Sequence, residues 1–318
     1  MGACTQYMVS CDVCKDDFNE TIISNRQRPI SQTRAYEASK AKLHNLGRRY
    51  LIKKQIPSLI KAKKKGEMIV WVLGTGITPV PGLKWEENKL YDLVIYTGQT
   101  RKGFRHGLGI QIWPDGTYFE GMWRKNKAHG LGRLVHSTHD SIESNWIKGK
   151  MQGYGIYHHS SGLISSGYWE DDKQEGLGQE LWPSGLSYKG EYRQGLKHGK
   201  GYTRFEDGSY YEGTFKYNNI SGKGKYHWKD GKVYDGEWED NKMHGIGRLV
   251  WKDGREYFGE FFNDLRDGFG TFVWPNGKKY AGKWRKGKQH GVGTMIAENG
   301  KALKGEYFQG KRLRWINE

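Results

Sequence analysis

Glycine recurs along most of the chain with a fixed step of 23 residues, and this repeat constrains the fold more than any other feature. A Gly-x-Gly pair begins, without one insertion, at Gly107, Gly130, Gly153, Gly176, Gly199, Gly222, Gly245, Gly268 and Gly291. Two further glycine columns keep the same step, one beginning at Gly116 and broken only by His139, the other beginning at Gly121 and broken only by Ser144. Such a repeat predicts an array in which each repeat packs against its neighbours.

Aromatic residues flank the third glycine column. Two residues after it, every repeat carries a ring: Trp123, Trp146, Trp169, Tyr192, Phe215, Trp238, Phe261, Trp284 and Tyr307. Two residues before it stand Phe119, Tyr188, Tyr211, Tyr234, Tyr257 and Tyr280, with Ile142, Ser165 and Leu303 as departures. A spacing of i, i+2 and i+4 places aromatic, glycine and aromatic on one face of a strand. Because the intervening residues are mostly polar, we expect one aromatic and one solvated face.

Each repeat also contains two turn signals. Residues Trp113 to Gly116 read Trp-Pro-Asp-Gly in the middle of a repeat, and Asn241-Lys242 or Gly287-Lys288 mark a join. Asp-Gly and Asn-Gly between β-forming runs are strong hairpin signals, and 23 residues leave no room for a crossover helix. We therefore predict an all-β fold: an elongated single-layer tape of nine antiparallel hairpins over residues 96–318, with a partial leading repeat. A neighbouring repeat's ring can cover a glycine backbone, so the rings are expected to form the core.

The segment from Tyr234 to Gly247 carries a family resemblance. Its pattern Tyr-x-Gly-x-Trp-x-x-Asn-Lys-x-His-Gly-x-Gly resembles the MORN (membrane occupation and recognition nexus) repeat, and the match extends over residues 96–318. The resemblance implies a scaffold, because stand-alone proteins of this kind are often structural parts of motile cilia, including radial spoke heads, or of other cytoskeletal assemblies. A second implied class is the junctophilin-like membrane protein. Plant phosphatidylinositol phosphate kinases and some lysine methyltransferases also carry such repeats, but we expect no such domain here, since Glu318 follows the last Gly-x-Gly by about one repeat.

Residues that suggest catalysis or metal binding have simpler explanations. A histidine recurs at His106, His129, His198, His244 and His290. Equivalent positions in successive repeats should lie about 10 Å apart, several times a metal–nitrogen bond of about 2.1 Å. Gly-x-Gly is followed by strand, whereas a nucleotide fingerprint requires a helix. We predict no catalytic residue, no metal, no cofactor and no enzyme activity.

Composition restricts the environment. The formal charge is +17, and 12 of these charges fall between Arg26 and Lys65, which hold 13 Lys or Arg and one acid. Three cysteines in the first 14 residues indicate a reducing compartment. The longest apolar run, Met68 to Leu73, is too short to span a bilayer, and no leader opens the chain, so we expect a cytoplasmic protein.

Residues 31–66 read as a basic helical arm after an irregular tail at 1–30. Tyr36, Leu43, Leu46 and Tyr50 recur at helical spacing among lysines and arginines. The candidate partner-binding residues are Arg48, Arg49, Lys53, Lys54, Lys61, Lys63, Lys64 and Lys65. Anionic lipid, nucleic-acid phosphate and an acidic protein surface such as tubulin all suit such an arm. Nucleic acid is the least supported, because the rings that could stack on bases belong to the array. Alternatively, the apolar stripe packs on the first repeats.

The N-terminus offers two further candidates. Gly2 and Cys4 could carry myristate and palmitate, the two signals that stable anchoring needs, although Gln6 stands where Ser or Thr is favoured. Cys11 and Cys14 with Cys4 give three thiolates without a fourth zinc ligand, so free thiols are the simpler explanation. Residues 67–95 are expected to cap the array with strands at Ile69–Leu73 and Leu90–Ile95.

These patterns lead to one prediction of function. We expect a non-enzymatic scaffold that binds other proteins of a large assembly, placed on a ciliary axoneme by family resemblance alone. The alternative is a membrane-associated repeat protein that binds acidic phospholipid through its N-terminus.

Overall fold

The computed structural model describes residues 78–91 and 93–316, all of them in strands, turns and irregular segments. Every strand pairing in this part of the chain is antiparallel, which confirms the predicted all-β class. The described residues contain no helix that could span a membrane. The tail at 1–30, the arm at 31–66, Gly2, Cys4 and the strand expected at Ile69–Leu73 all lie outside the described residues.

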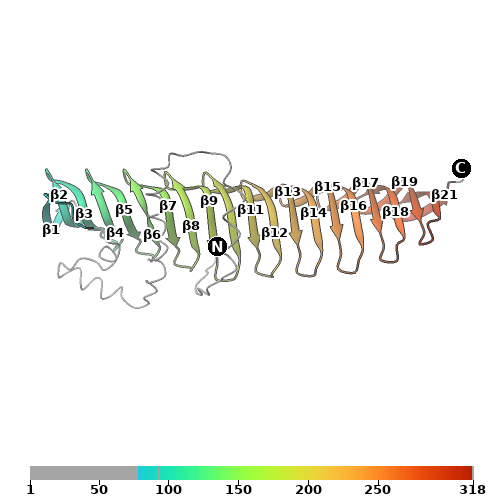
Figure 1. Cartoon of the computed structure of the whole chain (residues 1–318), viewed down its shortest axis with the longest axis horizontal. Helices are drawn as coiled ribbons and strands as arrows, with labels where there is room; N and C mark the ends of the chain where they lie inside the picture. Colours follow the sequence, from blue (N-terminus) through green and yellow to red (C-terminus); the bar gives the residue numbers. More distant parts are fainter. Residues whose placement is uncertain (1–77, 92, 317–318) are drawn as a thin grey trace. The chain divides into compact units, whose positions relative to one another are not determined.

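The chain divides into two compact units, unit 1 (Met1–Lys173) and unit 2 (Gln174–Glu318). Within each unit the strands follow one another in chain order (Figure 1). The strands of unit 1 are β1 (Lys84–Tyr91), β2 (Val94–Arg101), β3 (Phe104–Ile112), β4 (Tyr118–Arg124), β5 (Lys127–Val135), β6 (Ser141–Ile147), β7 (Lys150–His158) and β8 (Ile164–Glu170). From the boundary onward the strands are β9 (Lys173–Leu181), β10 (Ser187–Arg193), β11 (Leu196–Arg204), β12 (Tyr210–Lys216), β13 (Asn219–His227), β14 (Val233–Glu239), β15 (Lys242–Val250), β16 (Glu256–Phe262), β17 (Leu265–Val273), β18 (Lys279–Arg285), β19 (Lys288–Ile296), β20 (Ala302–Phe308) and β21 (Lys311–Trp315).

Two kinds of turn join these strands. The Trp-x-x-Gly turn lies where it was predicted, with the Gly116 amide donating to the Trp113 carbonyl at 3.0 Å. The join is a two-residue turn in which both residues have positive φ, as at Asp240 (45°) and Asn241 (66°). This is the turn whose twist matches antiparallel strands. It lies one residue earlier than the predicted Asn241-Lys242, because both members of the pair must adopt the left-handed conformation.

The glycines form a row across the strands, which is continuous in unit 2 and interrupted by Ser144 in unit 1. In unit 2, Gly224 pairs with Gly236, Gly236 with Gly247, and Gly247 with Gly259. A Cβ added at Gly247 would lie 2.3 Å from the Tyr234 hydroxyl oxygen. The row therefore leaves room for a ring of the preceding repeat, as the sequence indicated. The first glycine of each Gly-x-Gly instead has a positive φ beside a register shift, as at Gly245 (56°).

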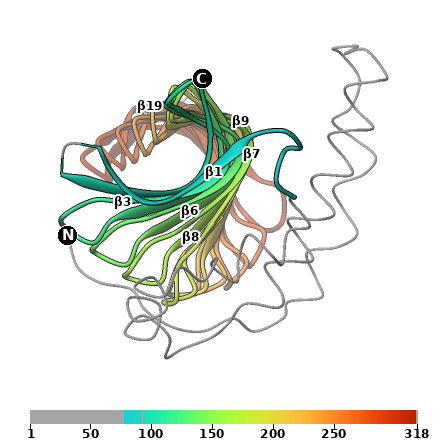
Figure 2. The same ribbon diagram turned by 90° about the vertical axis from the view of Figure 1, so that its left-hand side faces the viewer.

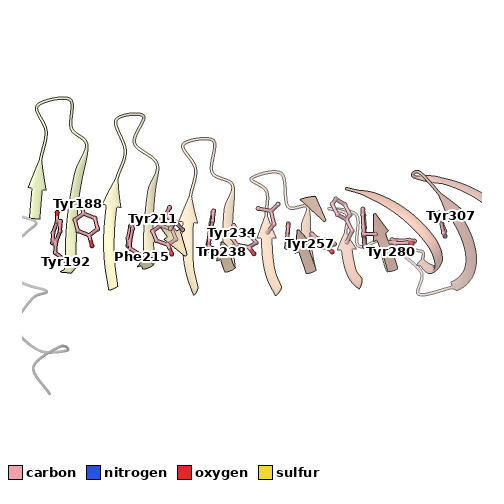
Figure 3. Close-up of a cluster of buried hydrophobic side chains, with 14 residues drawn as sticks. Tyr188, Tyr192, Tyr211, Phe215, Tyr234, Trp238, Tyr257, Tyr280 and Tyr307 are labelled. Atoms are coloured by element: carbon pink, nitrogen blue, oxygen red, sulfur yellow. The ribbon is translucent and has the colours of Figure 1, made fainter. Parts of the chain in front are cut away.

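Aromatic rings pack over the glycine row of unit 2 as an alternating ladder (Figure 3). Tyr234 meets Trp238 and Phe261 edge to face, with centroids 5.1 Å away in both cases. The Tyr234 hydroxyl donates to the Glu237 carbonyl at 2.9 Å, and Trp238 Nε1 donates to the Gly224 carbonyl at 3.1 Å. Tyr234 and Trp238 therefore each contribute apolar burial, favourable ring geometry and a satisfied polar atom.

The ladder of unit 1 is shorter. Phe119 packs edge to face on Trp123 and Trp146, at 5.1 and 5.3 Å. The next positions in this column are Ile142 and Ser165, and Trp169 is only partly buried against the cluster. Loss of two rings from the pattern thus ends the aromatic stacking near the end of this unit.

One predicted strand is wrong. Residues Leu90–Ile95 are the end of β1 at Tyr91, a turn, and the start of β2 at Val94. Leu90 and Leu93 are exposed, so this apolar run surrounds a hairpin turn instead of filling a core. The strand before the turn, β1, is largely polar and was not predicted.

Candidate docking surface

The sheet face opposite the rings, here called the outer face, carries the candidate site. On this face lies the middle residue of each Gly-x-Gly. In unit 2 this column contains Ile246, Phe269 and Val292, which are 54%, 66% and 47% exposed. The sequence predicted a solvated polar face here, and for these three repeats that prediction is wrong.

Neighbouring side chains widen the apolar surface. Phe258 and Phe262 alternate with the buried Tyr257 and Phe261 along β16, so they point to the outer face. Leu265 pairs with Phe262 across the turn between β16 and β17. We define the outer patch as Ile246, Phe258, Phe262, Leu265, Phe269 and Val292, all of which are exposed. Several exposed apolar side chains on one face mark an interaction site more often than scattered single residues do.

Part of the outer patch borders a cavity of about 880 Å³. Its lining includes Ile246, Phe262, Leu265 and His244, with Glu260 and Asp267 beside them. The His244 ring lies 5.2 Å from the Phe262 ring, and its Nδ1 is 3.3 Å from a Glu239 carboxylate oxygen. The histidine column therefore flanks the turns, as the sequence indicated.

The carboxylates of the cavity already accept backbone hydrogen bonds. Glu260 accepts from the Phe269 amide at 2.7 Å, and Asp267 accepts from the Lys286 amide at 3.0 Å. These bonds hold negative charge beside the apolar side chains. Lys286 and Arg285 also line the cavity. The arrangement can bind apolar side chains together with a cation.

Titration in this unit is dominated by burial. Desolvation raises the pKa of Tyr211 to about 12 and raises the pKa of Tyr234 and Tyr257 as well, so these hydroxyls stay neutral. On the outer face, the hydrogen bond from Arg248 holds the pKa of the Glu256 carboxyl below its ordinary value. Among the described residues no group of three or more His, Cys, Asp or Glu could hold a metal ion.

Of the residues singled out from the sequence, His244 and Phe261 line the cavity beside the outer patch. Rings of the predicted core such as Trp238 and Phe261 are buried, whereas Trp169 is only partly so. These rings pack in the ladders of the opposite face of the sheet. The basic residues from Arg48 to Lys65 lie outside the described residues.

Sequence reasoning missed the outer patch, although a signal exists. The middle residue of Gly-x-Gly reads Leu, Leu, Tyr, Leu, Lys, Lys, Ile, Phe and Val along the nine repeats. An outer-face column of a single-layer sheet needs no apolar residue, yet this column is apolar or aromatic in seven of the nine repeats, including the three successive repeats of the patch. Reading each column for its residue type, and not only for its period, would have found the patch.

Comparison with known proteins agrees with this architecture. A family model described as MORN repeat matches residues 96–118, 119–141, 143–164, 166–187, 188–210, 211–233, 234–254, 257–279 and 280–301. These matches cover more than half of the chain, and the chain belongs to the MORN-repeat family. Proteins of this class are repeat scaffolds that bind proteins or membranes.

Other comparisons add little. No curated protein matches the chain. Among solved structures, the G-box domain of the microcephaly protein CPAP gives a TM-score of 0.34 at 12% identity, covering 64% of this chain and 100% of that chain. The SAS-4 (dCPAP) TCP domain of Drosophila melanogaster gives a TM-score of 0.31 at 16% identity, covering 49% of this chain and 84% of that chain. At these scores neither similarity carries an argument.

Proposed function

We propose that the chain is a non-enzymatic scaffold that binds other proteins of a cytoskeletal assembly through the outer patch of unit 2, on the axoneme of a motile cilium. The observation that carries the proposal is the exposed apolar column Ile246, Phe269 and Val292, one residue per repeat. The axonemal place rests on the resemblance to stand-alone MORN proteins of radial spokes and other cytoskeletal assemblies.

The spacing of the column suits an α-helix of a partner. Successive members lie two strands apart, which corresponds to about 9.6 Å at the usual strand spacing of about 4.8 Å. Seven helical residues rise about 10.5 Å. A helix crossing the strands can therefore present an apolar side chain every seventh residue to Ile246, Phe269 and Val292 in turn. Sustained heptads of this kind are typical of coiled-coil proteins.

Charge sharpens the description of this partner. Glu237, Glu260 and Asp267 line the cavity beside the apolar column. A lysine or arginine next to an apolar position of the helix would face these carboxylates. We propose that the bound segment is an amphipathic helix with a basic edge.

The test compares two positions of the same column. Phe269→Ser removes an apolar side chain from the outer patch, whereas Lys223→Ser changes the equivalent exposed position two repeats earlier. In cells, detergent and moderate salt should leave the wild-type chain and the Lys223→Ser variant in the cytoskeletal pellet and release the Phe269→Ser variant at least tenfold more. Equal retention of both variants would show that the outer patch does not bind the cytoskeletal assembly.

The membrane alternative has one structural observation in its favour. The exposed Phe262 lines the same cavity as Arg285 and Lys286, and a ring beside cations suits a membrane interface. It predicts release of the chain by detergent alone, labelling of Gly2 by a myristate analogue, and sedimentation with vesicles that contain phosphatidylserine. The carboxylates of the cavity oppose it, because an acidic bilayer would repel them.

A further inference from the structure

The charge of the outer face changes sign within unit 2, whose strands form one curved layer (Figure 2). On β14 three exposed residues that alternate with the buried rings are acidic: Asp235, Glu237 and Glu239. On β18 three exposed residues that alternate with the buried rings are basic: Lys279, Lys283 and Arg285. The four strand steps from β14 to β18 correspond to about 19 Å. A partner that crosses these strands therefore meets both charges within a short distance.

One row of neighbouring side chains crosses the outer patch from strand to strand. Ile246 of β15 pairs with Glu260 of β16, and Phe269 of β17 pairs with Lys283 of β18. The Phe269 amide donates to a Glu260 carboxylate oxygen at 2.7 Å, so the row continues from β16 to β17. Val292 of β19 is the next member of the apolar column. Apolar and charged side chains therefore alternate along the row.

The two charged members of this row have opposite signs at the same repeat position. Glu260 and Lys283 are 23 residues apart in the sequence, and Glu237 stands one repeat before Glu260. The sign therefore changes between Glu260 and Lys283. Arg285, two residues after Lys283 on β18, adds a second exposed cation on that side.

A helix that crosses the strands meets this row at two spacings. Seven helical residues rise about 10.5 Å, close to the step of about 9.6 Å between apolar members of the row. A residue three or four positions after an apolar contact lies on the same face of the helix and rises about 4.5 to 6 Å. It therefore comes opposite the charged residue of the intervening strand, about 4.8 Å away. The row thus specifies the charges halfway between the apolar contacts of the helix.

We propose that the helix which binds the outer patch carries a basic residue opposite Glu260 and an acidic residue opposite Lys283. Its apolar contacts to Ile246, Phe269 and Val292 are thus separated first by a cation and then by an anion. This inference rests on the proposed function and adds the charge pattern of the partner. A uniformly basic helix would be repelled at Lys283, and a uniformly acidic helix would be repelled at Glu260.

Two synthetic helical peptides test this pattern by fluorescence anisotropy with the full-length chain. Both hold leucine at three positions seven residues apart and lysine halfway between the first two leucines. Halfway between the second and third leucines, the mixed peptide holds glutamate and the basic peptide holds lysine. We expect the mixed peptide to bind the wild-type chain about fivefold more tightly than the basic peptide, because exposed charge pairs are worth up to about 1 kcal/mol.

Matched variants locate the effect. Lys283→Glu should reverse the order of the two affinities. Lys200→Glu makes the same change at an exposed outer-face position of β11 and should leave the order unchanged. Phe269→Ser should weaken the binding of both peptides. Circular dichroism verifies the strand content of each variant; where Lys283→Glu loses it, Lys283→Gln takes its place and should abolish the preference for the mixed peptide.

The outcomes separate this inference from the proposed function. Equal affinities of the two peptides for the wild-type chain, or an order that a folded Lys283 variant leaves unchanged, would overturn the charge pattern while a helix still docks. No binding of either peptide, or binding that Phe269→Ser does not weaken, would overturn both the charge pattern and the docking of a helix on the outer patch. A chain that sediments as a dimer, which Phe269→Ser dissociates, would assign the patch to a second copy and overturn the proposal.

Discussion

Units 1 and 2 are built from the same hairpin but differ on both faces. The ring ladder of unit 2 continues from Tyr188 to Tyr307, whereas that of unit 1 stops after Trp146. On the outer face, Glu120 of unit 1 is buried and Phe258 of unit 2 is exposed. The glycine row runs through both units, with one break at Ser144 of unit 1, so it defines the fold. The side chains on the ring face and on the outer face can change without loss of the hairpin. On the outer face such changes can give the two units different partners.

The largest expected effect separates the continuous ladder from its interrupted end. Trp238→Ala should lower the free energy of unfolding by about 3 to 5 kcal/mol, because a buried ring and its hydrogen bond to Gly224 are lost. Trp169→Ala should cost less than about half of that, since Trp169 is only partly buried and its Nε1 has no hydrogen-bond partner among the described residues. Urea denaturation followed by circular dichroism measures both. Equal losses of unfolding free energy would mean that the interruption of the ring ladder in unit 1 does not affect stability.

The glycine row gives a second, smaller contrast. Gly247→Ala should cost about 2 to 3 kcal/mol, because the new Cβ would meet the Tyr234 ring at 2.3–2.4 Å. At the equivalent position of the interrupted region, a Cβ at Gly155 would meet the Ser144 hydroxyl at 2.8 Å, so Gly155→Ala should cost under about 1.5 kcal/mol. Thermal unfolding of both variants checks the difference. A Gly155→Ala loss as large as that of Gly247→Ala would contradict the role assigned to the ring.

How far the sequence predicts this molecule follows from the same contrast. The 23-residue step, the glycine columns and the rings around Tyr234 sufficed for the antiparallel hairpins, because each of these features has one steric explanation. The run from Leu90 to Ile95 was wrongly predicted as one strand, because an apolar run around a two-residue turn resembles a strand in the sequence. Phe269 escaped attention because a solvated face was expected wherever the rings were not. Exposure of an apolar residue depends on what covers the sheet, and the period of a repeat carries no information on that.

Stability at alkaline pH should depend on whether a position of the ring ladder holds tyrosine or phenylalanine. Burial raises the pKa of Tyr211 to about 12, above the ordinary value of about 10. Between these values the unfolded chain loses a proton that the folded chain keeps, so stability is intact below about pH 10 and falls as pH rises toward 12. The contribution of one such group is about 1.4 kcal/mol per pH unit.

Tyr211→Phe should therefore reduce the alkaline slope of unfolding free energy by about 1.4 kcal/mol per pH unit. Phe119 occupies this column in unit 1, and Phe119→Tyr is the matched reverse change, expected to steepen the slope. Urea titrations at pH 9.5, 10.5 and 11.5 provide the values. Identical slopes for the wild type and Tyr211→Phe would show that this hydroxyl is not desolvated.

The smallest expected effect lies on the outer face, where equivalent arginines have different surroundings. Arg248 forms two hydrogen bonds to Glu256 at 2.6 and 2.8 Å, but its side chain is 58% exposed, so Glu256→Gln should cost only about 0.5 kcal/mol. The hydrogen bond lowers the pKa of Glu256, so this contribution is present above about pH 4.5 and disappears as pH falls through the lowered pKa. It should also weaken in 1 M salt, because screening acts on exposed charges. Arg133, at the same repeat position in unit 1, is more enclosed, so Glu143→Gln should keep its cost at high salt. A Glu143→Gln loss that vanished with salt would mean that Arg133 faces water, and the two outer faces would then be alike.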